Sequence, residues 1–165
     1  MNEDQMTLRK AIELAITTED MGADFYQRLH RKYKDDTEMA EIFERLAKDE
    51  KIHKAQFETI LKHSEDALSE HRGYEQMRWL RATAISEFFR DDAFKDTDQI
   101  EDRDEVLGRA LSFEKATLQY YEALRDVIGE HPDLEKVINT EKDHVMSIVR
   151  LLPTDGKFRG LGDKF

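Results

Sequence analysis

The stretch LAKDEKIHKAQF, residues 46–57, decides the fold, because Glu50 and His53 interrupt an otherwise apolar helical stripe. Residues three apart on a helix lie on one face, about 4.5 Å apart along its axis. Both side chains can therefore reach one metal ion. A carboxylate buried between helices costs several kcal/mol unless it is paired or bound to metal. The stretch predicts a core helix that carries two metal ligands.

A second stretch, NTEKDHVMSI (residues 139–148), repeats this spacing with Glu141 and His144. Each pair follows an upstream helix with one more glutamate on its apolar stripe, Glu19 in the first half and Glu114 in the second. Two divalent ions would neutralise the four carboxylates, and the two imidazoles would complete six protein ligands without adding charge. The pattern predicts a dinuclear metal site inside a helical bundle.

Apolar residues recur at steps of three and four along most of the chain, and only two of the 165 residues are prolines. The fold class is therefore all-α. The expected architecture is a four-helix bundle of two antiparallel hairpins, joined by a long crossover that contains a short helix. We expect this bundle to span residues 1–153, followed by a flexible tail over 154–165. The long helices are expected at about residues 5–34, 37–70, 104–128 and 132–152.

The two halves of the chain repeat one another. AITTE at residues 15–19 aligns with ALSFE at residues 110–114, and the Glu-x-x-His pairs recur 91 residues apart. A duplicated helical hairpin explains both this offset and the offset of 95 residues between AITTE and ALSFE. The second hairpin fits less evenly, because its upstream glutamate lies farther from the turn than Glu141 does. We therefore expect the third helix to end early or the last two helices to be staggered.

Composition excludes several classes of function. The net charge of -11 disfavours nucleic acid and anionic lipid surfaces as partners, and it favours cations. The absence of cysteine excludes disulfides, thiolate zinc sites, iron–sulfur clusters and thiol nucleophiles, so oxygen and nitrogen must hold any metal. The polar N-terminus and the lack of a long apolar run lead us to expect a soluble cytoplasmic protein without a membrane partner.

Two tyrosines are candidate catalytic residues. Tyr26 and Tyr121 each lie seven residues after a stripe glutamate, on the same helical face. Core packing with a locally bonded hydroxyl is one interpretation. In the other, each hydroxyl bonds to a ligand carboxylate of the opposite hairpin and fixes its orientation. A structural bundle that holds adventitious zinc is a further alternative for the chain as a whole.

Four stretches carry a resemblance to the rubrerythrin-like branch of the ferritin-like superfamily: AITTEDMGADFY, LAKDEKIHKAQF, ALSFEKATLQYY and NTEKDHVMSI. The resemblance covers about residues 10–152. It implies a homodimer that reduces hydrogen peroxide or dioxygen in oxidative stress. It also implies two iron ions, with manganese or zinc as possible substitutes. The ligands that it implies are Glu19, Glu50, His53, Glu114, Glu141 and His144.

The sequence departs from rubrerythrins in two respects. It has no cysteine for the rubredoxin domain that supplies electrons in full rubrerythrins, so the resemblance implies an external electron donor protein. Rubrerythrins also tend to have an extra carboxylate one turn after the third-helix glutamate, where this chain has Thr117. The alternative function is therefore an iron-binding, storage or ferroxidase protein that takes ferrous iron as its substrate.

Overall fold

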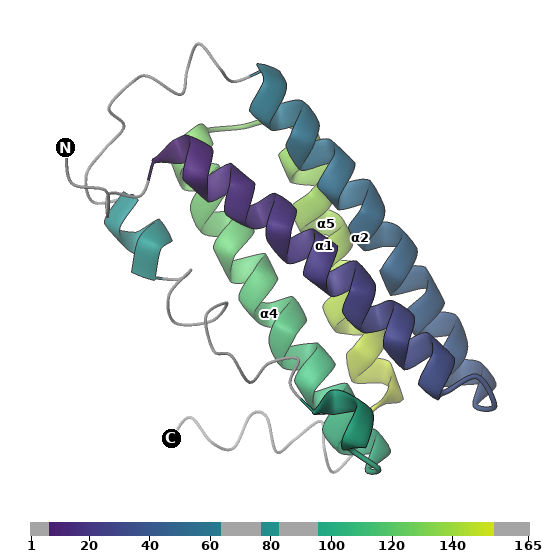
Figure 1. Ribbon diagram of the computed structural model, residues 1–165. Helices are drawn as coiled ribbons and strands as arrows, with labels where there is room; N and C mark the ends of the chain where they lie inside the picture. The colour runs from purple at the N-terminus through teal and green to yellow at the C-terminus, as the bar shows by residue number, and fades with distance from the viewer. Residues whose placement is uncertain (1–6, 64–76, 83–95, 154–165) are drawn as a thin grey trace, which may run out of the picture.

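The computed structural model describes residues 7–63, 77–82 and 96–153, and it contains no strand within these ranges. The prediction of an all-α bundle is confirmed (Figure 1). Residues 77–82 are also helical, as expected for the crossover, and Thr97–Gln99 form a short 3-10 helix, η2. The four long helices are α1 (Leu8–Lys32), α2 (Thr37–His63), α4 (Arg103–Ile128) and α5 (Pro132–Leu151).

The helix ends follow from local chemistry. The Thr7 hydroxyl accepts a hydrogen bond of 3.2 Å from the backbone N–H of Lys10 and so caps the start of α1. Gly129, with a φ of 87°, ends α4 in a conformation that a residue with a Cβ rarely adopts. The side chain of His131 caps the start of α5, and Pro132 occupies the first turn. His131, which showed no pattern in the sequence, therefore has a structural role.

The second hairpin is staggered. Helix α4 continues to Ile128 and α5 begins at Pro132, so α4 does not end early. Glu114 instead lies opposite His144, with its Oε2 atom 3.2 Å from Nδ1 of the imidazole. We expected either an early end of the third helix or a stagger of the last two helices, and the structure has the stagger.

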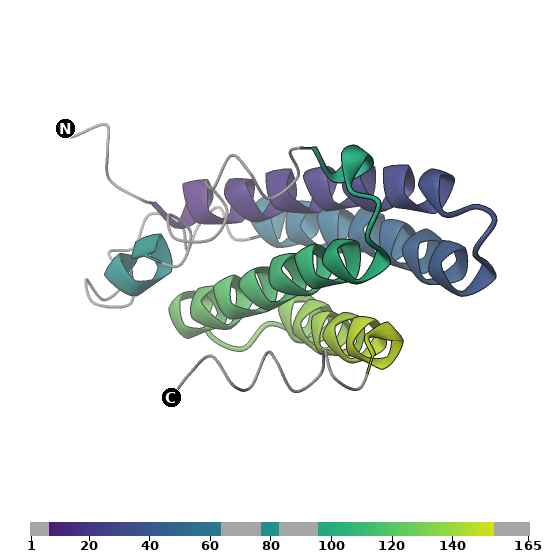
Figure 2. The ribbon, with the colours of Figure 1, turned by 90° about the horizontal axis from the view of Figure 1, so that it is seen from below.

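The four helices pack as two hairpins, with α1 against α2 and α4 against α5. Helix α2 also packs against α5, and α1 against α4, which closes the bundle (Figure 2). Apolar side chains form two separate clusters. One includes Ile12, Phe57 and Val137, and the other includes Leu46 and Ile148. The predicted ligands fall between these clusters along every helix, so a polar layer separates two apolar ends of the core.

None of the described helices is long and apolar enough to cross a membrane. The predicted tail over residues 154–165 lies outside the described residues.

Candidate metal centre

All four long helices contribute to one buried polar layer. The helical stripes turn these polar side chains inward together with the apolar residues on either side of them. Each predicted ligand exposes at most 1% of its surface. The structure brings together all six of them: Glu19 from α1, Glu50 and His53 from α2, Glu114 from α4, and Glu141 and His144 from α5.

One group of possible ligands surrounds the His53 imidazole. Its Nδ1 atom lies 3.0 Å from Oε1 of Glu141 and 3.1 Å from Oε2 of Glu50. The same nitrogen lies 3.5 Å from Oε2 of Glu19. One donor atom from each of these four residues lies within 4.8 Å of the other three. Four donors at this spacing form a cage of the size that one metal ion occupies.

A second group surrounds His144. Its Nδ1 atom lies 3.2 Å from Oε2 of Glu114, 3.4 Å from Oε2 of Glu141 and 4.0 Å from Oε1 of Glu50. Glu50 and Glu141 belong to both groups, whereas Glu19 and Glu114 each belong to one. The two imidazole rings are 5.5 Å apart between their centres. The two groups of possible ligands are therefore continuous and share two carboxylates.

The donor set fits metal ions because several of its oxygens lack a hydrogen-bond partner. Oε1 of Glu50 has no hydrogen-bond partner among the described residues, and the Glu141 oxygens, although 3.0 Å and 3.4 Å from the two imidazole nitrogens, receive no well-directed hydrogen bond there. Each unsatisfied buried acceptor costs about 1–3 kcal/mol. A cation placed among these oxygens would remove that cost. Mixed carboxylate and imidazole donors suit iron, manganese and zinc.

The charges of the centre also depend on protons. Burial raises the pKa of Glu50 well above its usual value, and burial together with the charge of Glu141 raises the pKa of Glu114 to about 8. Burial by itself would lower the pKa of His53, but the carboxylates of Glu141, Glu19 and Glu50, all within 3.5 Å of its Nδ1 atom, raise it to about 12. Without metal, protons therefore provide part of the positive charge that the carboxylates require.

These pKa shifts predict that the metal-free protein becomes less stable as the pH rises. Above the usual pKa of 4.5 for Glu114 and 6.5 for His53, the unfolded chain releases protons that the folded protein retains. Stability then falls with pH, by about 1.4 kcal/mol per pH unit for each retained proton, until the folded pKa values of about 8 and about 12 are passed.

Thermal unfolding followed by circular dichroism in the presence of a chelator measures this effect. We expect a lower midpoint at about pH 9 than at about pH 6, because that interval lies within the window set by the two groups. A midpoint that rises over this interval would show that the buried groups do not retain protons.

The two tyrosines contact ligand carboxylates of the opposite hairpin. The Tyr26 hydroxyl donates a hydrogen bond to Oε1 of Glu114, and the Tyr121 hydroxyl donates one to Oε1 of Glu19. Burial raises the pKa of both tyrosines, so both remain protonated donors. The ring of Phe57 packs 4.7 Å from that of Tyr121 and holds it in place. These contacts match the hydrogen-bonding interpretation of the two residues, and their part in catalysis stays a prediction.

One residue of the centre, Asp49, gives no signal in the sequence. Oδ2 of Asp49 lies 3.1 Å from Nε2 of His144, the ring nitrogen that points away from the ligand oxygens. Asp49 lies outside the apolar stripe of α2, in a chain of which 38% is charged, so no periodic signal distinguishes it. Thr117 does face the core, but its hydroxyl donates to the backbone carbonyl of Phe113 at 2.9 Å. That position therefore supplies no additional carboxylate.

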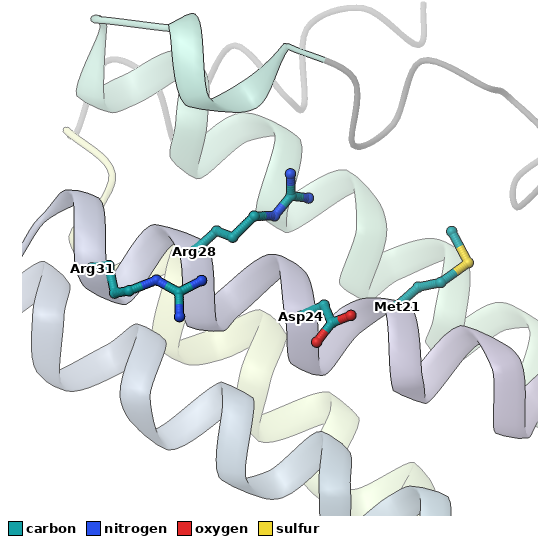
Figure 3. Close-up of a pocket in the computed structure, with 4 residues that line it drawn as sticks. All are labelled: Met21, Asp24, Arg28 and Arg31. Carbon is teal, nitrogen blue, oxygen red and sulfur yellow. The ribbon is translucent and has the colours of Figure 1, made fainter.

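The surface pocket of Figure 3 is separate from this centre. The side chains that line it, Met21, Asp24, Arg28 and Arg31, all come from α1. Met21, Asp24 and Arg31 are exposed, whereas Glu19 on the same helix faces the interior. None of the six predicted ligands lines this pocket.

Comparison with known proteins supports the resemblance seen in the sequence. Residues 10–80 match the rubrerythrin family, and this stretch includes Glu19, Glu50 and His53. No curated protein and no solved structure gives a significant match to the chain. The family match and the all-helical bundle are together consistent with a rubrerythrin-like protein of the ferritin-like kind.

Proposed function

We propose that the chain is a non-haem di-iron oxidoreductase of the rubrerythrin type, which reduces hydrogen peroxide or dioxygen with electrons from an external donor protein. The observation that supports this function best is the buried cluster of four glutamates and two histidines, with two groups of donors that share Glu50 and Glu141. Carboxylate-rich centres of this kind suit ions that exchange ligands with a substrate, in contrast to closed thiolate zinc sites.

In this proposal the six residues hold two iron ions, and two of the glutamates contact both. Glu19, Glu50, His53 and Glu141 would hold one iron ion, and Glu50, Glu114, Glu141 and His144 the other. The two ions would supply the two electrons that convert one hydrogen peroxide and two protons into two water molecules.

The surroundings of the ligands determine their orientation and their access to water. The Tyr26 and Tyr121 hydroxyls restrict the rotation of Glu114 and Glu19, because each tyrosine bonds to one oxygen and leaves the other available. The apolar clusters on both sides exclude bulk water, which strengthens every charge interaction within the layer. We propose a cytoplasmic homodimer as the functional form.

Anaerobic stopped-flow mixing with peroxide tests the proposal. The protein is loaded with two ferrous ions per chain and mixed with one equivalent of hydrogen peroxide. We expect both ions to be oxidised in one fast phase, with one peroxide consumed for every two ions. Zinc-loaded protein is the control, because zinc has no electron to give. Oxidation no faster than that of free ferrous iron would contradict the proposal.

The alternative is an iron-binding or storage protein without dedicated peroxide turnover. One observation favours it, namely that the Thr117 hydroxyl is bonded to its own helix where rubrerythrins tend to have another carboxylate. Repeated additions of ferrous iron and oxidant distinguish the two functions. An oxidoreductase stays at two ions per chain and returns to the ferrous state when a reductant is added. A storage protein accumulates further iron with each addition.

A further inference from the structure

We infer that Asp49 is a positioning residue for one of the two metal ions and that the two halves of the centre therefore bind metal with different strength. This inference rests on the proposed metal-binding function. Its basis is the contact of 3.1 Å between Oδ2 of Asp49 and Nε2 of His144. The other ring nitrogen, Nδ1, faces the carboxylates of Glu114 and Glu141. Each nitrogen of this imidazole therefore has a separate partner.

The equivalent position in the other half carries no carboxylate. The offset of 91 residues that relates the two Glu-x-x-His pairs places Thr140 where the first pair has Asp49. The Thr140 hydroxyl donates to the backbone carbonyl of Lys136 at 3.0 Å, within its own helix. Every contact that His53 makes with a described side chain within hydrogen-bonding distance uses Nδ1. Only one of the two histidines therefore has an acceptor at Nε2 among the described residues.

This difference affects metal binding through the state of the imidazole ring. An ionised aspartate can only accept a hydrogen bond, so Nε2 of His144 carries the proton and Nδ1 presents its lone pair to the ligand cage. The contact also fixes the ring orientation and makes the imidazole a stronger donor. His53 must adopt the correct tautomer and orientation without this support. Loss of such an outer partner typically lowers metal affinity about 10–100-fold.

The ion at Glu50, Glu114, Glu141 and His144 should therefore bind first. Titration of the full metal-free chain with Co²⁺ tests this, with the visible absorption of the bound ion as signal and a competing chelator to set the affinity scale. We expect two steps in the wild-type protein. Asp49→Ala should weaken the tighter step about 10–100-fold and leave the weaker step unchanged. Asp49→Asn retains a weaker acceptor. Its affinity in the tighter step should therefore lie between those of the wild-type protein and Asp49→Ala.

Asp20→Ala is the matched control. Asp20 also adjoins a predicted ligand in sequence, but its side chain is exposed and pairs with Lys54 at 2.6 Å on the surface. We expect the affinities of both steps to stay at their wild-type values. A helical circular dichroism spectrum for each variant verifies that it has folded.

Proton NMR of the Co²⁺-loaded protein supplies a readout that a purely structural role would not change. Each ligand imidazole gives one exchangeable, strongly shifted N–H signal. In Asp49→Ala, we expect the signal of His144 to broaden or exchange faster with solvent, while that of His53 remains. Equal weakening of both steps, or two unchanged steps in Asp49→Ala, overturns the inference but leaves the metal centre intact. Failure of the wild-type chain to bind two ions overturns the proposed function as well.

Discussion

In the proposed two-ion centre, Glu141→Gln is expected to remove both metal ions, whereas Glu19→Gln is expected to leave one bound. The reason is that Glu141 belongs to both groups of donors and Glu19 to only one. The Glu141 carboxylate lies 3.0 Å from Nδ1 of His53 and 3.4 Å from Nδ1 of His144. Neutralising it therefore removes a negative charge next to both groups of donors and replaces one of its two donor oxygens by an amide nitrogen that does not bind metal.

The loss of metal affinity in Glu141→Gln should be larger than the loss caused by removing a hydrogen-bond partner of a ligand, which lowers affinity about 10–100-fold. We expect both affinities to fall more than ~100-fold in Glu141→Gln, and only one of them to fall in Glu19→Gln. Metal analysis after gel filtration gives the number of ions per chain, and titration with Co²⁺ gives the affinities. Glu135→Gln is the control, because this glutamate lies on the same helix but pairs with Arg125 outside the centre. Retention of one ion in Glu141→Gln would contradict the shared position of this carboxylate.

The helices and the cluster could be predicted from the sequence because both depend on periodicity. A charged residue within an apolar stripe is rare and energetically costly, so Glu50 and Glu141 stood out against the many charges on the solvent faces. The order of the elements followed from the turn residues, since Gly129 and Pro132 mark the short break between α4 and α5. These signals are local in the chain and do not require knowledge of packing.

The remaining features depend on how the helices are placed against one another. The stagger of α4 and α5 is determined by the geometry of the turn between them, and no residue type encodes it. The role of Asp49 depends on which side chain of α5 lies opposite α2. The capping role of His131 depends on one backbone conformation next to Pro132. Because each of these features involves a single contact, no repeated pattern in the sequence could identify it.

Joint replacement of Glu50 and His53 by leucine is expected to raise the stability of the metal-free protein and to abolish its stabilisation by metal. In the metal-free centre, burial raises the pKa of Glu50, and its Oε1 atom has no hydrogen-bond partner among the described residues. Replacement of a buried ion pair by apolar residues of similar volume is often neutral or stabilising, by about 1–4 kcal/mol. That gain corresponds to roughly 2–4 °C in the unfolding midpoint per kcal/mol for a chain of this length.

Metal acts in the opposite direction, because it stabilises the wild-type protein and not the double variant. A ligand at 100 times its dissociation constant stabilises the folded state by about 2.7 kcal/mol, and we expect this gain in the wild-type protein only. The single variant His53→Leu is the matched control. It leaves Glu50 buried without its imidazole partner at 3.1 Å, which should cost about 3–5 kcal/mol. Thermal unfolding of the three proteins, with chelator and with added Co²⁺, measures all of these differences. If the double variant were as unstable as the single variant, or gained as much stability from Co²⁺ as the wild-type protein, then the two side chains would be structural and not metal ligands.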